Sequence, residues 1–112
     1  MTRLPGLRDL VTRQERANAD LLYPHRPTWT DGGSARVDVE EADPRSRAYA
    51  RAVQTAPDLA QQDVRFLTYH PDDTPPAEGS ECAWDGGTLT LRHWGQVDEY
   101  DGTALGICVW RL

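Results

Sequence analysis

The sequence contains no lysine, and all twelve of its basic residues are arginine. This bias most simply reflects a GC-rich coding sequence rather than selection for arginine contacts at every site. Acidic residues are in excess, with 18 Asp and Glu and a formal net charge of −6. Five arginines face three acids in residues 1–26, whereas seven face fifteen in residues 27–112. Such a surface repels phosphate over most of the chain, so nucleic acid is disfavoured as a partner.

Long apolar runs are also missing. No stretch of about 18 apolar residues could cross a membrane, and the opening residues 1–6 lack the apolar core of a signal peptide. We therefore expect no membrane partner and a location in the cytoplasm or within an assembled particle. A length of 112 residues fits one domain, residues 1–112, with a single core.

Cysteine is scarce, with Cys82 and Cys108 as the two thiols. No second thiol or imidazole lies at a zinc-finger interval from either. Reduced, partly buried thiols are expected in a cytosolic protein. Whether the two residues pair stays open, because a sequence cannot place two Cα atoms within bridging distance.

The first part of the domain, residues 1–26, is predicted to be a helix followed by a connector. Pro5 suits the first helical turn and Pro24 stops the helix. The apolar stripe of this helix either packs on the rest of the domain or docks a partner protein. Steps of three and four residues define that stripe, which contains Leu7, Leu10, Val11, Ala17, Leu21 and Leu22.

The second part, residues 27–61, is predicted to form a hairpin and a second helix. Residues 29–34 have turn chemistry, and residues 35–40 alternate between apolar and charged as a half-buried strand does. Asp43 followed by Pro44 predicts a helix start, with the carboxylate as the cap. An apolar stripe from Tyr49 to Ala56 continues this helix as far as Pro57.

The third part, residues 62–112, is predicted to be rich in strands. Residues 64–69 alternate with period two, and residues 71–76 form a proline-rich loop. The Asp-Gly pairs at 85–86 and 101–102 predict two hairpins. Residues 105–110 are apolar on both faces, which is typical of a central strand.

Together these patterns predict an α+β fold, in which two helices pack on a mostly antiparallel, twisted sheet or a small β-barrel. No cofactor motif is present, because the glycine pairs lie in hairpins rather than between a strand and a helix. The three histidines form no metal-ligand motif, and no catalytic or metal site is assigned. Whether the acidic loops bind a cation stays open.

Without a catalytic constellation, we expect a noncatalytic module that binds another protein or assembles with itself. Four tryptophans and the acidic loops suit an interface. In size and general layout the chain is similar to the small β-rich joining and decoration proteins of tailed-phage particles, which implies a structural component of a virion but assigns no residue a role. The residues expected at the interface are Trp29, Trp84, Trp94, Trp110, Asp72 and Asp73.

Two alternatives remain. The first is a small acidic inhibitor or regulator that imitates nucleic-acid charge and occupies a basic groove on its partner. The second is a small enzyme in which Cys82 and His93 lie within hydrogen-bond reach, with a third group that orients the imidazole ring.

Overall fold

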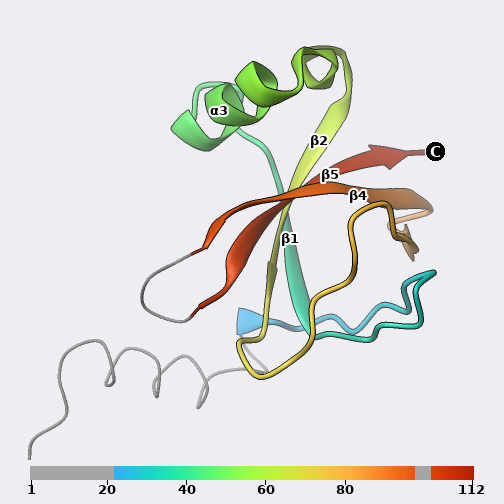
Figure 1. Cartoon of the computed structure of the whole chain (residues 1–112). Helices are drawn as coiled ribbons and strands as arrows, with labels where there is room; N and C mark the ends of the chain where they lie inside the picture. Colours follow the sequence, from blue (N-terminus) through green and yellow to red (C-terminus); the bar gives the residue numbers. More distant parts are fainter. Residues whose placement is uncertain (1–21, 98–101) are drawn as a thin grey trace, which may run out of the picture.

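The computed structural model describes residues 22–97 and 102–112. Its centre is a five-stranded antiparallel sheet that curls into a half-barrel (Figure 1). The strands lie in the order β1-β2-β5-β4-β3. They are β1 (Val37–Glu41), β2 (Asp63–Tyr69), β3 (Glu81–Trp84), β4 (Gly87–Val97) and β5 (Ala104–Arg111).

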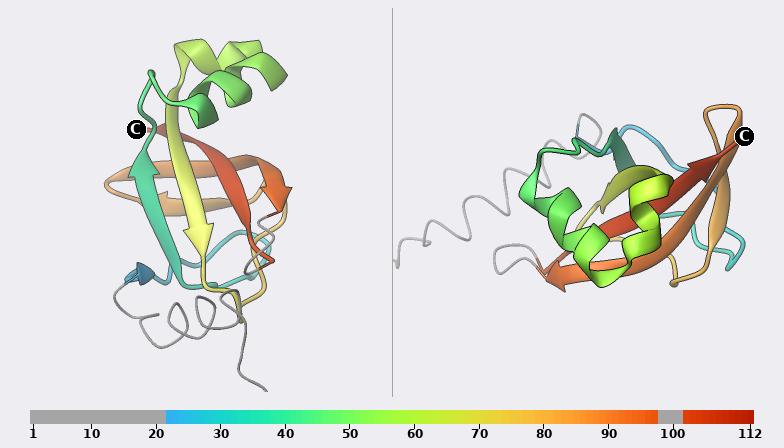
Figure 2. Two further views of the ribbon diagram at one scale, coloured as in Figure 1. Left: turned by 90° about the vertical axis from the view of Figure 1, so that its left-hand side faces the viewer. Right: turned by 90° about the horizontal axis from the view of Figure 1, so that it is seen from above.

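The described residues contain one α-helix, α3 (Arg47–Thr55), followed by the 3-10 helix η1 (Pro57–Gln61). The fold is therefore mostly β, and the expectation of two helices packed on a sheet is wrong. The first predicted helix falls largely on residues 1–21, outside the described part of the chain. The helical layer is small because a single nine-residue helix and one 3-10 turn cover only one end of the strands (Figure 2).

The helix α3 begins three residues later than expected. The Ser46 hydroxyl accepts a hydrogen bond from Tyr49 N at 3.1 Å, so Ser46 is the N-cap. Asp43 instead closes a turn by accepting from Arg45 N at 2.9 Å. Asp and Ser are both good cap residues, but only Ser46 caps this helix. The helix ends before Pro57, as expected.

The sheet has two apolar faces. The tryptophan face carries Leu67, Leu91 and Cys108, against which Trp29 packs. The helix face carries Val64, Ile107 and Val109, which pack with Ala52 of α3 and Leu59 of η1. β5 contributes to both faces and lies in the middle of the sheet, which confirms the prediction of a central strand apolar on both sides.

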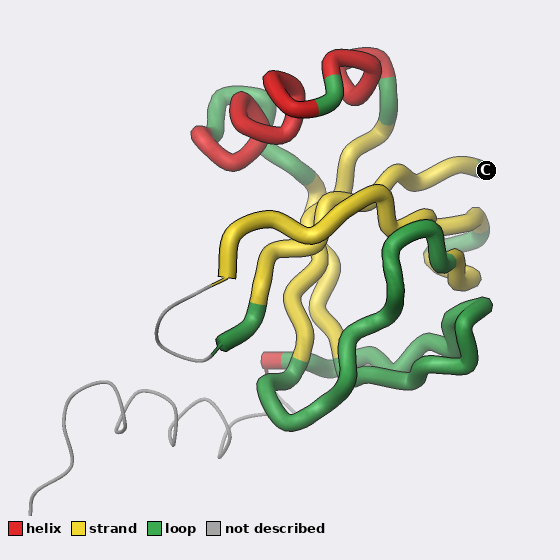
Figure 3. The backbone as a smooth tube through the Cα atoms, in the orientation of Figure 1, coloured by secondary structure: helices red, strands yellow, loops and turns green. Residues whose placement is uncertain are grey.

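Two loops lie at the end of the sheet away from α3 (Figure 3). The turn at residues 29–33 bonds to β3, with Thr30 N donating to Glu81 O at 2.9 Å. It does not join two ladder strands, because the residues before it form only an isolated bridge, from His25 to Val37. The expected first hairpin is therefore wrong. The two C-terminal hairpins are confirmed: β3 pairs with β4 and β4 with β5.

The geometry of the turn between β3 and β4 explains why the sequence predicts this hairpin. Asp85 and Gly86 both have positive φ, at 47° and 79°. Two consecutive positive φ values define the type I′ turn, whose twist matches that of paired strands. Asp tolerates this region better than most residues, and Gly adopts it without steric cost.

Candidate binding groove

A β-bulge in β4 decides which side chains reach the helix face. Leu91 pairs with Cys108 and His93 pairs with Ile107, so Arg92 is the extra residue between two consecutive pairs of β5. Strict alternation would put His93 on the same face as Leu91. The bulge turns His93 toward the helix face, where it lines a pocket with Ile107, and returns Trp94 to the tryptophan face. Bulges are often found where a strand re-aims a functional side chain.

The space between α3 and the sheet is a pocket of about 320 Å³. Ala52 and Ile107, which are 3% and 4% exposed, form part of its apolar floor. Small helix residues leave this volume open, because three of the four α3 residues that line the pocket are Ala48, Ala52 and Thr55; the fourth is Arg51. We call this the helix pocket, and its lining is Ala48, Arg51, Ala52, Thr55, His93, Gly95, Gln96, Leu105 and Ile107.

A second, more open depression of about 550 Å³ continues from the helix pocket across the rest of the helix face. The two share Arg51, Gln96 and Leu105. Val97, 60% exposed, and Leu22, 44% exposed, line the second depression. We call the two together the outer groove. The second depression is lined by Leu22, Tyr23, Asp38, Arg51, Thr68, Gln96, Val97, Thr103, Ala104 and Leu105.

The α3 end of the outer groove carries two side chains with N–H donors, Arg51 and His93. The guanidinium of Arg51 and the ring of His93 have no hydrogen-bond or ion-pair partner within residues 22–97 and 102–112. Two other arginines differ: Arg92 pairs with Asp58 at 3.1 Å, and Arg65 pairs with Asp63 at 3.0 Å. The α3 end of the groove is thus free to meet an anion, on a chain that is acidic overall.

The four tryptophans serve mainly the opposite face. Trp29 is 2% exposed, and its indole N–H is buried with no hydrogen-bond partner among the described residues. Trp94 Nε1 donates to Pro76 O at 3.0 Å, and Trp110 Nε1 donates to Trp84 O at 2.7 Å. Trp84, Trp94 and Trp110 are half-buried against the core of that face. Their use at an interface stays a prediction.

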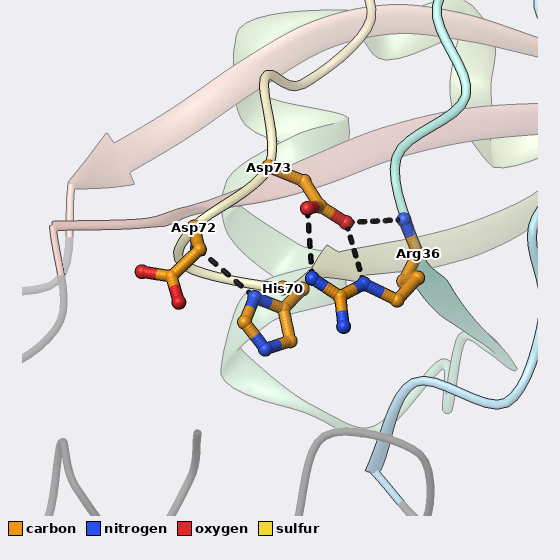
Figure 4. A network of polar contacts seen from close by, with 4 residues as sticks. All are labelled: Arg36, His70, Asp72 and Asp73. Carbon is orange, nitrogen blue, oxygen red and sulfur yellow. Dashed lines mark hydrogen bonds and ion pairs between the residues drawn. The ribbon is translucent and has the colours of Figure 1, made fainter. Parts of the chain in front are cut away.

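The two acidic candidates lie in a network of polar contacts around a buried histidine (Figure 4). Asp73 accepts from Arg36 three times, from Nε, from Nη2 and from the backbone N, each at 2.9 Å. His70 accepts from Asp72 N through Nδ1 at 3.0 Å. These contacts join the loop after β2 to the residue before β1. Asp73 therefore holds two segments together, and its charge is matched within the chain.

Arg36 also sets the ionisation of this carboxyl. Its side-chain hydrogen bonds hold the pKa of Asp73 well below the usual range, against the opposing effect of burial. Asp31, on the neighbouring turn, has a lowered pKa because it accepts from the backbone N–H groups of Ala77 and Gly33. Both carboxylates stabilise the turn and the loop by accepting hydrogen bonds from other segments of the chain.

The thiols are free and buried. Cys82 lies opposite Leu89 and Cys108 opposite Leu91, so β4 separates them. Two strand spacings amount to about 9.6 Å, beyond the ~6.8 Å Cα separation that a disulfide spans. Burial raises the pKa of Cys82 to about 11, and burial with the nearby Cys82 raises that of Cys108 to about 12. A neutral thiol is a poor nucleophile.

Cys82 and His93 are not brought together. Cys82 belongs to the core of the tryptophan face, whereas His93 lines the helix pocket on the other side of the sheet. Within the described ranges, no group of three or more His, Cys, Asp and Glu side chains is placed to hold a metal ion. No helix in this part of the chain has the length and apolarity needed to cross a membrane.

Sequence reasoning missed the outer groove. Arg51 lies in the helix predicted after Asp43, and Val97 lies between the two Asp-Gly turns predicted at 85–86 and 101–102. Neither residue suggested a site. The small residues at positions 48, 52 and 55 were the available signal, since they predict close packing and also permit a pocket. The bulge at Arg92 had no counterpart in the alternation pattern.

Comparison with protein-family models, with curated proteins and with solved structures finds no match to this chain. The geometry of the outer groove is therefore the basis for a functional proposal.

Proposed function

We propose that this chain is a noncatalytic protein-binding module, and that the outer groove receives an extended segment of a partner protein. The observation that supports it is the exposure of Val97. This side chain is 60% exposed and lines an open groove with an apolar floor. Exposed apolar surface rimmed by polar side chains is typical of interaction sites. The floor near Val97 contains Leu105, with Thr68 and Gln96 as polar neighbours.

Charge favours a particular partner chemistry. Arg51 and His93 leave the α3 end of the groove cationic or hydrogen-bond donating, and Asp38 lines the other end. A segment that combines an acidic residue with apolar residues is complementary to this pattern. The partner that we propose is thus an acidic, apolar peptide segment, in keeping with the expectation of another protein as partner.

The roles expected from the sequence remain proposals beside this one. A structural place in a particle such as a phage virion is compatible with a peptide-binding groove, as is a regulatory role. The acidic-inhibitor alternative is less well supported at Asp73, because Arg36 already neutralises that carboxylate.

The test is a selection from displayed random 12-residue peptides with the purified full chain as bait. We expect enriched peptides that bind the parent and the Leu112→Asp control but lose at least tenfold affinity for Val97→Asp. Leu112 is a matched control because it is 97% exposed and does not line the groove. Equal binding to both variants, or no enrichment, would overturn the proposal.

Self-association is examined with the same variants by light scattering. A dimer that Val97→Asp dissociates, and Leu112→Asp does not, would assign the groove to a second copy and contradict the peptide proposal. A monomer that binds selected peptides supports it.

A further inference from the structure

The helix pocket differs from the rest of the outer groove in both shape and chemistry. It lies between a helix and a sheet, whereas the neighbouring depression is wider and more open. Its apolar floor can take a small aliphatic group, whose burial removes apolar surface from water. The pocket is therefore suited to hold one side chain rather than a length of chain.

Polar groups at the pocket converge from two elements. Arg51 comes from α3 and His93 from β4, and the bulge at Arg92 is what places the imidazole ring on this side of the sheet. The guanidinium offers a planar fork of N–H donors that matches a carboxylate. A ring nitrogen of His93 adds a further donor from the opposite wall.

The acids that the structure describes near the helix pocket do not compete for these donors. Asp58, on η1, is engaged with Arg92 at 3.1 Å. Among residues 22–97 and 102–112, no acidic residue lines the helix pocket, and Asp38 lines only the neighbouring depression. An incoming carboxylate would thus meet Arg51 with its donors available, and its carbon atoms would rest on Ala52 and Ile107.

We infer that the helix pocket is an anchor for a carboxylate attached to a short aliphatic group, such as a Glu side chain next to an apolar residue of the partner. This inference rests on the proposed function, of which it names the recognition element. Arg51 binds the carboxylate as a bidentate pair, His93 donates to one carboxylate oxygen, and the floor contacts the methylene groups.

The probe is 4-methylpentanoate, with 4-methylpentanamide as its uncharged counterpart of the same shape. Each is titrated into the isotopically labelled full chain, and amide chemical shifts are followed by NMR. We expect the carboxylate to shift the amides of His93, Gln96 and Ala52 in a saturable way. The amide should bind at least tenfold more weakly.

Two arginine variants separate a specific pair from general charge. Arg51→Gln should weaken 4-methylpentanoate at least tenfold. Arg47→Gln should change it less than twofold, since Arg47 is exposed on the same helix but does not line the pocket. His93→Gln, which keeps a donor, should have an intermediate effect. Unchanged amide shifts outside the pocket report that each variant is folded.

Several outcomes would overturn the anchor. Equal binding of the acid and the amide, loss of binding in both arginine variants, or shifts spread over the whole surface would each do so. Inorganic phosphate that binds as tightly as 4-methylpentanoate would show that the aliphatic floor plays no part. If the probes fail while selected peptides still depend on Val97, the carboxylate anchor is wrong and the peptide groove stands.

Discussion

The two faces of the sheet use their apolar residues differently. On the tryptophan face, loops and indole rings close the surface, and Leu67, Leu89 and Leu91 are fully buried. On the helix face, α3 and η1 cover only one end, and Leu105 stays half-exposed beside the outer groove. One face is filled, which stabilises the fold, whereas the other is left partly open at the site that we propose for binding.

The polar contacts follow the same division. The Arg36 and Asp73 side chains, 27% and 20% exposed, hold the loops at one end of the sheet with bidentate geometry. On the helix face, Arg92 and Asp58 are 34% and 53% exposed. Solvent screens the second pair more strongly, so it contributes less.

The largest expected effect contrasts two leucines on neighbouring strands. Leu91→Ala removes a fully buried side chain from the tryptophan face and should lower the free energy of unfolding by about 3 kcal/mol. Leu105→Ala should cost about 1 kcal/mol, because its site already opens to water. Urea denaturation measures both. An equal decrease in the free energy of unfolding for the two variants would contradict the difference in packing between the faces.

The next effect concerns the ion pairs. Asp73→Asn should destabilise by about 2 kcal/mol at pH 7, since charge-assisted hydrogen bonds from Arg36 are lost. Asp58→Asn should cost about 0.5 kcal/mol or less. Thermal unfolding of both variants beside the parent provides the measurement. A larger loss for Asp58→Asn would reverse the assignment.

The Asp73 pair also predicts a pH dependence. A carboxyl whose folded pKa is depressed contributes stability above its unfolded pKa, about 3.9, and loses it as pH falls further toward the folded pKa. The stability gap between the parent and Asp73→Asn should therefore be constant from pH 7 to about pH 5 and shrink below about pH 4. A gap that does not shrink in acid would contradict this linkage.

A smaller effect is expected at the indole hydrogen bonds. Trp110→Phe keeps an aromatic ring on the tryptophan face but removes the donor to Trp84 O. A cost of about 1 kcal/mol follows, part of it from the unpaired carbonyl. Chemical denaturation tests it. No change would indicate that solvent already satisfies Trp84 O.

The smallest effect belongs to the groove itself. Val97→Ser should change stability by less than about 0.5 kcal/mol, because the side chain is 60% exposed. Peptide binding should weaken all the same. Denaturation measures the stability of the variant, and titration of a selected peptide measures its binding. Intact stability together with weakened binding would show that Val97 serves binding rather than the core.

Local patterns in the sequence determined much of this protein. Alternation placed β2, the two Asp-Gly pairs placed the C-terminal hairpins, and two-sided apolarity identified β5 as central. Each of these signals depends on neighbours along the chain. The expected balance of helix and strand is wrong, because in the described residues one nine-residue helix and one 3-10 helix accompany five strands.

Only the tertiary structure decided what the two faces do. Whether Cys82 meets Cys108 or His93 depends on strand order and on a bulge, and no local pattern encodes either. The tryptophans belong to a core because loops distant in sequence fold over them. The outer groove exists because α3 is too short to cover its face of the sheet, a property of packing between elements rather than of any segment alone.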